Sequence, residues 1–131
     1  MRAATEEWLV SARDDLETIT EIVGNPRLTH VVAFHAQQCI GKGCKAILEE
    51  REEDIPHIHN LVTLHERAGV SLEADETLDV LDRLNQLYIG ARYPGERGLL
   101  PEGQPSQEEV RQFHRVATQF YERIHQRLKD E

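Results

Sequence analysis

FHAQQCIGKGCKAIL, residues 34–48, is the stretch of sequence that decides the fold of this chain. It is long enough for about four helical turns and is apolar on nearly all sides. A helix with so little polar surface is expected at the centre of a helical bundle. One polar stripe interrupts it at helical spacing, formed by His35, Gln38, Lys42 and Lys45. Because buried polar groups need partners, this stripe is expected to meet another helix, a second subunit or a ligand.

The size and charge of the chain limit the functions open to it. Its 131 residues suit a single domain over residues 1–131, and a chain of this size can bury roughly two-thirds of its unfolded surface. The 24 acidic residues outnumber the 15 basic ones, for a net charge of -9. This surplus disfavours broad, non-specific nucleic-acid binding, although a local basic pocket remains open. Aromatic residues make up only 5% of the chain, which disfavours a base-stacking platform.

Cysteine usage and hydropathy favour a cytoplasmic protein. Cys39 and Cys44 lie five residues apart in one predicted helix, where their side chains point to different sides and cannot pair. Reduced cysteines that act as small core residues fit a reducing cytosol. We expect no signal peptide, because residues 1–8 contain no apolar run. We also expect no membrane span, because no apolar run approaches ~20 residues.

Apolar spacing of three and four residues predicts helices along the whole chain and no strands. The predicted helices cover about residues 5–23, 29–51, 61–67, 74–91 and 106–128. Gly24 is expected in a left-handed conformation at the end of the first helix, and Thr29 and Asn60 are expected as N-caps. Gly41 and Gly43 each cost about 1 kcal/mol relative to Ala within a helix. A close helix–helix approach would offset that cost.

The last two long helices have clear apolar faces. The predicted face of the fourth helix consists of Leu78, Leu81, Leu84 or Asn85, Tyr88 and Ala91. The last helix begins with a capping box, Ser106 to Glu109, and its apolar seam consists of Val110, Phe113, Ala117, Phe120, Ile124 and Leu128. The prediction is an all-α, up-and-down bundle of four long helices and one short helix. Such small bundles often form two-fold dimers, so we expect a homodimer.

Three blocks, in this order, resemble the HEPN family (higher-eukaryote and prokaryote nucleotide-binding domains). Residues 34–46 are similar to the signature of the family's second helix, and 59–61 to its His-Asp-Leu turn. Residues 87–95, which contain Leu-Tyr and then Ala-Arg-Tyr-Pro-Gly, resemble the end of its penultimate helix. The resemblance implies a HEPN-type bundle. It also implies a prokaryotic toxin–antitoxin or defence module, in which such proteins are commonly paired with a minimal nucleotidyltransferase.

The ribonuclease motif of the family is missing from its usual place. HEPN ribonucleases carry Arg, then four to six residues, then His, near the end of the penultimate-helix region. After Arg92 the corresponding positions, 97–99, hold Arg, Gly and Leu. Arg51 and His57 satisfy the spacing, but they flank a helix end where the family does not place the pair. We therefore assign no catalytic residue.

The candidate ligand-binding residues combine charge with hydrogen-bonding groups. They are His35, Gln38, Lys42, Lys45, His59, Tyr88, Arg92 and Tyr93. Ammonium groups would attract a phosphate or nucleotide, and Arg92 offers a planar donor beside an aromatic ring. In the alternative interpretation, the stripe pairs with acidic residues of neighbouring helices or points to water, and Arg92 and Tyr93 are structural. Asp14 and Asp15 are interpreted as a solvated helix face.

No metal or cofactor is predicted. His57, His59 and His65 lack a supporting Cys or carboxylate at zinc spacing, and Glu122-x-x-His125 is only one copy of a di-iron signature that requires two. The leading hypothesis is a non-catalytic or weakly catalytic component that binds a nucleotide or a nucleotidyltransferase partner, with RNA as a further candidate ligand. One alternative is a metal-independent, toxin-like ribonuclease with a displaced active site, and another is a purely structural dimerisation module.

Overall fold

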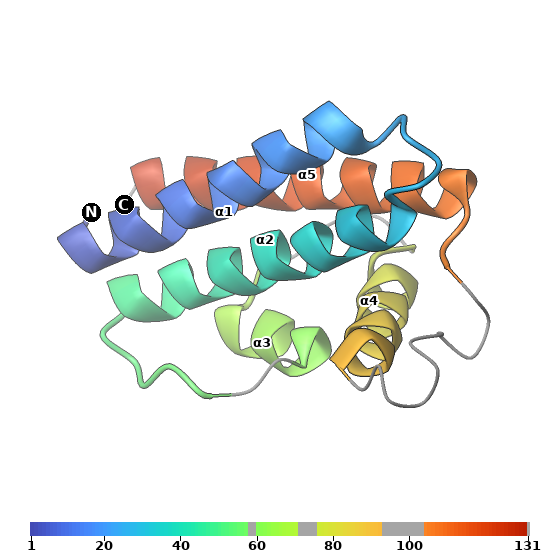
Figure 1. The fold of residues 1–131 in the computed structure, drawn as a ribbon. Helices are drawn as coiled ribbons and strands as arrows, with labels where there is room; N and C mark the ends of the chain where they lie inside the picture. Colours follow the sequence, from blue (N-terminus) through green and yellow to red (C-terminus); the bar gives the residue numbers. More distant parts are fainter. Residues whose placement is uncertain (58–59, 71–75, 93–103, 131) are drawn as a thin grey trace.

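Five α-helices make up the fold in the computed structural model, which describes residues 1–57, 60–70, 76–92 and 104–130 (Figure 1). They are α1 (Ala3–Ile22), α2 (Thr29–Glu50), α3 (Leu61–Ala68), α4 (Glu76–Arg92) and α5 (Gln107–Asp130). No strand occurs among the described residues. The predicted all-α architecture of four long helices and one short helix is therefore confirmed.

Helix α2 is the centre of the fold, as its apolar sequence predicts. It packs against each of the other four helices, and more than half of its residues are buried. Helices α1 and α5 lie along one side of α2, whereas α3 and α4 cover another side (Figure 1). The helix runs unbroken through both internal glycines. Its one polar stripe is left where the other helices do not cover it fully.

The two glycines of α2 play different roles. A Cβ atom at Gly43 would lie only 2.8 Å from Cδ1 of Ile124, so the absence of a side chain there allows α5 to approach α2 closely. A Cβ atom at Gly41 would lie 3.6 Å from Cδ2 of Leu61, which is an ordinary contact. The expected close approach is thus confirmed at Gly43 alone.

Side-chain caps fix two helix starts as the sequence predicts. The Asn60 side chain accepts hydrogen bonds from two backbone N–H groups in the first turn of α3. At α5, Ser106 Oγ accepts from the backbone N–H of Glu109 at 3.0 Å, and the Glu109 carboxylate accepts from the backbone N–H of Ser106 at 3.2 Å. Gly69, at a φ of 67°, ends α3 in the left-handed conformation that favours glycine.

Side chains from other elements hold the short helix α3 at both ends. An isolated helix of eight residues is unstable in water. Asn85 of α4 accepts a hydrogen bond from the backbone N–H of Leu61 at 2.9 Å. At the other end Arg51 donates to the Ala68 carbonyl at 3.0 Å, and Arg127 of α5 also donates to the final carbonyls. The guanidinium groups complement the negative end of the helix dipole.

Three local predictions are wrong. Thr29 is not an N-cap, because α2 begins there after Leu28, and its hydroxyl donates to another side chain. Gly24 does not have a positive φ, because the chain leaves α1 through a hydrogen-bonded turn without a left-handed residue. Leu78 is 53% exposed, because the face of α4 that meets the core is rotated about the helix axis relative to the predicted face. That face consists of Thr77, Val80, Leu81, Leu84 and Leu87.

Candidate functional site

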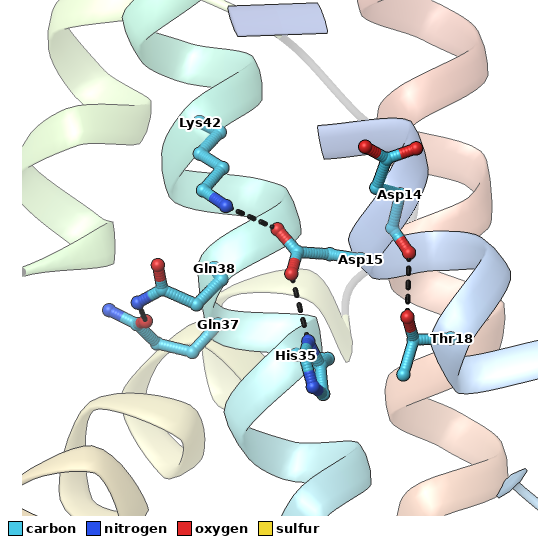
Figure 2. A network of polar contacts seen from close by, with 7 residues as sticks. All are labelled: Asp14, Asp15, Thr18, His35, Gln37, Gln38 and Lys42. Atoms are coloured by element: carbon cyan, nitrogen blue, oxygen red, sulfur yellow. Dashed lines mark hydrogen bonds and ion pairs between the residues drawn. The ribbon is translucent and has the colours of Figure 1, made fainter. Parts of the chain in front are cut away.

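The polar stripe of α2 meets a buried carboxylate on α1 (Figure 2). Asp15 is only 7% exposed. Its Oδ1 atom lies 2.8 Å from Nδ1 of His35, and its Oδ2 atom accepts a hydrogen bond from Nζ of Lys42 at 2.9 Å. Both carboxylate oxygens are therefore used, one for each stripe residue. Charge-assisted bonds of this kind are about twice as strong as neutral ones, so the cluster joins α1 to α2.

The interpretation of Asp15 as part of a solvated face is wrong. Only its neighbour Asp14 is exposed, and its carboxylate is turned away from His35 and Lys42 (Figure 2). The spacing of apolar residues in α1 could have placed Asp15 on the buried side of the helix. Position 15 lies three residues after the buried Ala12 and four before a buried isoleucine. A carboxylate at a core position opposite a polar stripe predicts a pair between the two helices.

Lys45 is the stripe residue whose charge is not balanced. No carboxylate of the described residues lies within ion-pair distance of its ammonium group, which sits 5.5 Å from the centre of the Trp8 ring. A cation above an indole gains a modest attraction. Partial burial lowers the pKa of Lys45, and repulsion from Lys42 lowers it further. Both causes favour loss of the proton, and a bound anion would oppose both.

Gln38 supplies an amide beside the two lysines. Its Nε2 donates a hydrogen bond to Oε1 of Gln37 at 2.8 Å (Figure 2). A primary amide nitrogen carries two hydrogens, so a second N–H of Gln38 remains for another acceptor. The side chain is half-buried, which leaves it within reach of a molecule at the surface.

A small pocket opens between these side chains. It has a volume of about 70 Å³, and its walls are Trp8, Gln37, Gln38, Gly41, Lys42, Lys45 and Leu64. Helices α1, α2 and α3 each contribute to it. Pockets for whole small molecules usually measure about 300–1,000 Å³. This pocket can therefore hold one small group of a ligand, but a base and a sugar would stay outside.

The structure brings together only part of the predicted site. His35, Gln38, Lys42 and Lys45 share one stripe, and the last three line the pocket. Tyr88 lies half-buried on α4 and is not part of the pocket wall. The remaining predicted residues, His59, Tyr93 and the side chain of Arg92, lie outside the described part of the chain. Sequence reasoning missed the walls from two other helices, Trp8 and Leu64, and Asp15 as the counter-charge.

Arg51 and His57 match the spacing of the ribonuclease motif, but Arg51 has a structural role in the fold. The Arg51 guanidinium donates to the carbonyls of Arg67 and Ala68 at 3.2 and 3.0 Å. This contact holds the end of α3 and uses two of the five N–H groups of the guanidinium, which gives Arg51 a structural role. His57 is exposed. The displaced ribonuclease site thus has no support from this part of the structure.

The described residues contain neither a metal-binding cluster nor a membrane-spanning helix. No group of three or more His, Cys, Asp and Glu side chains in that part of the chain is arranged to hold a metal ion. None of the described helices combines the length and apolarity needed to cross a bilayer.

The two cysteines are buried and free, and burial raises the pKa of the Cys39 thiol to about 12. Neither thiol is placed for nucleophilic chemistry.

Comparison with known proteins gives one match over nearly the whole length. A family model described as HEPN domain matches residues 5–128. An alignment over 57 residues, which covers 40% of this chain, is 33% identical to "SWI/SNF-related matrix-associated actin-dependent regulator of chromatin subfamily D member 2" of Homo sapiens and of Bos taurus. The match spans only 11% of each of those proteins. No solved structure matches significantly.

Proposed function

Because the chain belongs to the HEPN domain family, we propose that it is a nucleotide-binding component of a prokaryotic toxin–antitoxin or defence module. The binding site is the face that α1 and α2 share. The observation that carries this proposal is the unbalanced ammonium of Lys45 at the edge of a small pocket. An anion of the ligand would neutralise it, as Asp15 neutralises Lys42.

The charge distribution supports a local site on a chain that repels polyanions overall. The net charge is -9, so a long nucleic acid would meet repulsion over most of the surface. A mononucleotide covers only the α1–α2 face, where lysines and an amide converge. The site thus fits a small phosphate-bearing ligand better than a continuous RNA strand. A minimal nucleotidyltransferase as partner would supply or consume such a nucleotide.

We further propose a homodimer formed through α2. Phe34 is 45% exposed, which is unusual for a phenylalanine. Gln38 follows it by four residues and Lys45 by eleven, so all three side chains lie on the same side of α2. A two-fold contact through this residue would bring the pockets of both copies near one interface. Sedimentation should show a dimer for the wild type and a monomer for Phe34→Ser.

Nucleotide titration followed by thermal unfolding tests the proposed binding. A ligand that binds only the folded chain raises its stability by about 2.7 kcal/mol at one hundred times Kd. We expect a rise in Tm with a mononucleotide for the wild type and for Lys129→Met, and a clearly smaller rise for Lys45→Met at the same nucleotide concentration. Lys129 is an exposed lysine of α5 and serves as the matched control. An unchanged Tm with every nucleotide tested would contradict nucleotide binding.

The ribonuclease alternative needs its own assay. Incubation with labelled RNA, for the wild type and for His35→Ala, should show no cleavage by either protein. Cleavage that disappears in His35→Ala would replace the proposal with the catalytic alternative. Co-purification with the product of an adjacent small nucleotidyltransferase gene, where one exists, tests the partner.

A further inference from the structure

The size of the pocket restricts which part of a nucleotide can enter it. Its volume of about 70 Å³ holds only a few water molecules, since each needs roughly 10–15 Å³ on this measure. A phosphoryl group with its terminal oxygens is of this order, whereas a ribose or a base, with about twice as many heavy atoms, is larger. A group at the end of a ligand can therefore enter between the lysines, whereas a sugar or a base stays outside.

We propose that the pocket receives the terminal phosphate of a phosphomonoester, such as a nucleoside 5′-monophosphate, and excludes the internal phosphodiester of a nucleic acid. This inference rests on the proposed nucleotide binding and specifies its ligand class. An internal phosphate carries a sugar on both sides, so two large substituents would have to leave the pocket. A terminal phosphate carries only one, which can leave through the opening while the oxygens face inward.

The charge of the pocket favours the same ligand. Lys42 and Lys45 contribute two positive charges, and Asp15 contributes one negative charge, which leaves a surplus of one. A phosphomonoester carries about -1.5 to -2 charges at pH 7, because its second pKa is about 6. A diester carries a single charge and has two non-bridging oxygens instead of three. The more highly charged end group thus gains more from the pocket.

Hydrogen-bond donors are available for several phosphate oxygens. Lys45 has no ion pair among the described residues, and its ammonium carries three N–H groups. Gln38 retains one amide N–H after its bond to Gln37. Lys42 gives one N–H to Asp15 and keeps two others. Together these groups can donate to three terminal oxygens, a number that a diester does not offer.

Calorimetric titration with three probes tests this inference in phosphate-free buffer. The probes are adenosine 5′-monophosphate, the dinucleoside monophosphate adenylyl-3′,5′-adenosine, and inorganic phosphate. For the wild type we expect the monophosphate to bind at least tenfold more tightly than the dinucleoside. Lys45→Met should weaken monophosphate binding at least tenfold, whereas the control Lys129→Met should not change it.

A second variant tests pocket size without altering charge. Gly41 lines the pocket, and a Cβ atom there would make ordinary contacts at 3.6 Å or more with the core. Gly41→Ala should therefore fold normally and weaken monophosphate binding several-fold, because its methyl group reduces the space. An equal or higher Tm together with weaker binding would support a confined phosphate site.

The possible results separate the two proposals. Equal affinity for the monophosphate and the dinucleoside, both dependent on Lys45, would overturn the terminal-phosphate inference but leave nucleotide binding intact. Binding of inorganic phosphate without binding of either nucleotide would overturn both. Absence of binding by all three probes would also overturn both.

Discussion

The substitution Asp15→Asn tests whether the buried carboxylate stabilises the bundle. The change keeps the shape of the side chain and removes its charge. Asp15 accepts from Lys42 and contacts His35 at 2.9 and 2.8 Å, and its side chain is only 9% exposed. A hydrogen bond to a charged group contributes about 1.5–3 kcal/mol. An asparagine oxygen can replace one of the two contacts, which leaves one charged bond lost and one weakened.

We expect a loss of about 2 kcal/mol in the free energy of unfolding. For a chain of this length, about 2 kcal/mol lowers Tm by roughly 6–10 °C. The partners are about one-quarter exposed, at 25% for His35 and 24% for Lys42. Solvent screening therefore keeps the expected loss below the 3–5 kcal/mol typical of fully buried pairs.

Asp14→Asn is the matched control, because it removes the same charge from the adjacent exposed position. Its effect should lie within about 0.5 kcal/mol of zero. Urea unfolding of both variants at pH 7 gives the comparison. Adding Lys42→Met to Asp15→Asn should cost less than Lys42→Met alone, because the pair is then already broken. Equal stability of Asp14→Asn and Asp15→Asn would refute the structural role of the carboxylate.

Three further predictions concern the core and α3. Gly43→Ala should be less stable than Gly41→Ala by roughly 1–3 kcal/mol in urea unfolding, because both gain helix propensity but only the first overpacks the core; equal effects would contradict the close approach. Burial lowers the pKa of His65, so the folded state favours the neutral ring and loses stability as pH falls below about 6.5. Urea unfolding at pH 7.5 and 5.5 should show a smaller loss for His65→Gln than for the wild type, and an equal loss would contradict this. Asn85→Ala should destabilise the chain by about 1–3 kcal/mol, because the buried N–H of Leu61 loses its acceptor; a change under about 0.5 kcal/mol in thermal unfolding would count against it.

The sequence predicts the helices well where apolar spacing and caps agree. All six predicted seam residues of α5 are buried, because a long helix with one apolar face has only one way to cover it. The caps at Asn60 and Ser106 are also confirmed, since they depend on local chemistry alone. The rotated face of α4 could not be predicted as securely. Its residues offer several apolar positions, and packing against α2 selects among them.

The candidate site was predictable only in part, because its charge balance depends on contacts between helices. The stripe of α2 follows from spacing within one helix. Its neutralisation by Asp15, 27 residues before Lys42 along the chain, requires the packing angle of α1 on α2. The pocket likewise needs Trp8 and Leu64 from two other helices. Lys42 and Lys45, equivalent in the sequence, therefore have different roles in the folded chain.

Lysine-selective NMR tests most directly whether Lys45 is the unbalanced cation of the site. The chain has only three lysines, Lys42, Lys45 and Lys129, so their ammonium signals can be assigned by single substitutions. We predict that Lys45 titrates below the ordinary lysine pKa and that adenosine 5′-monophosphate raises this pKa. An ordinary titration of Lys45 that does not respond to the nucleotide would contradict the proposed site.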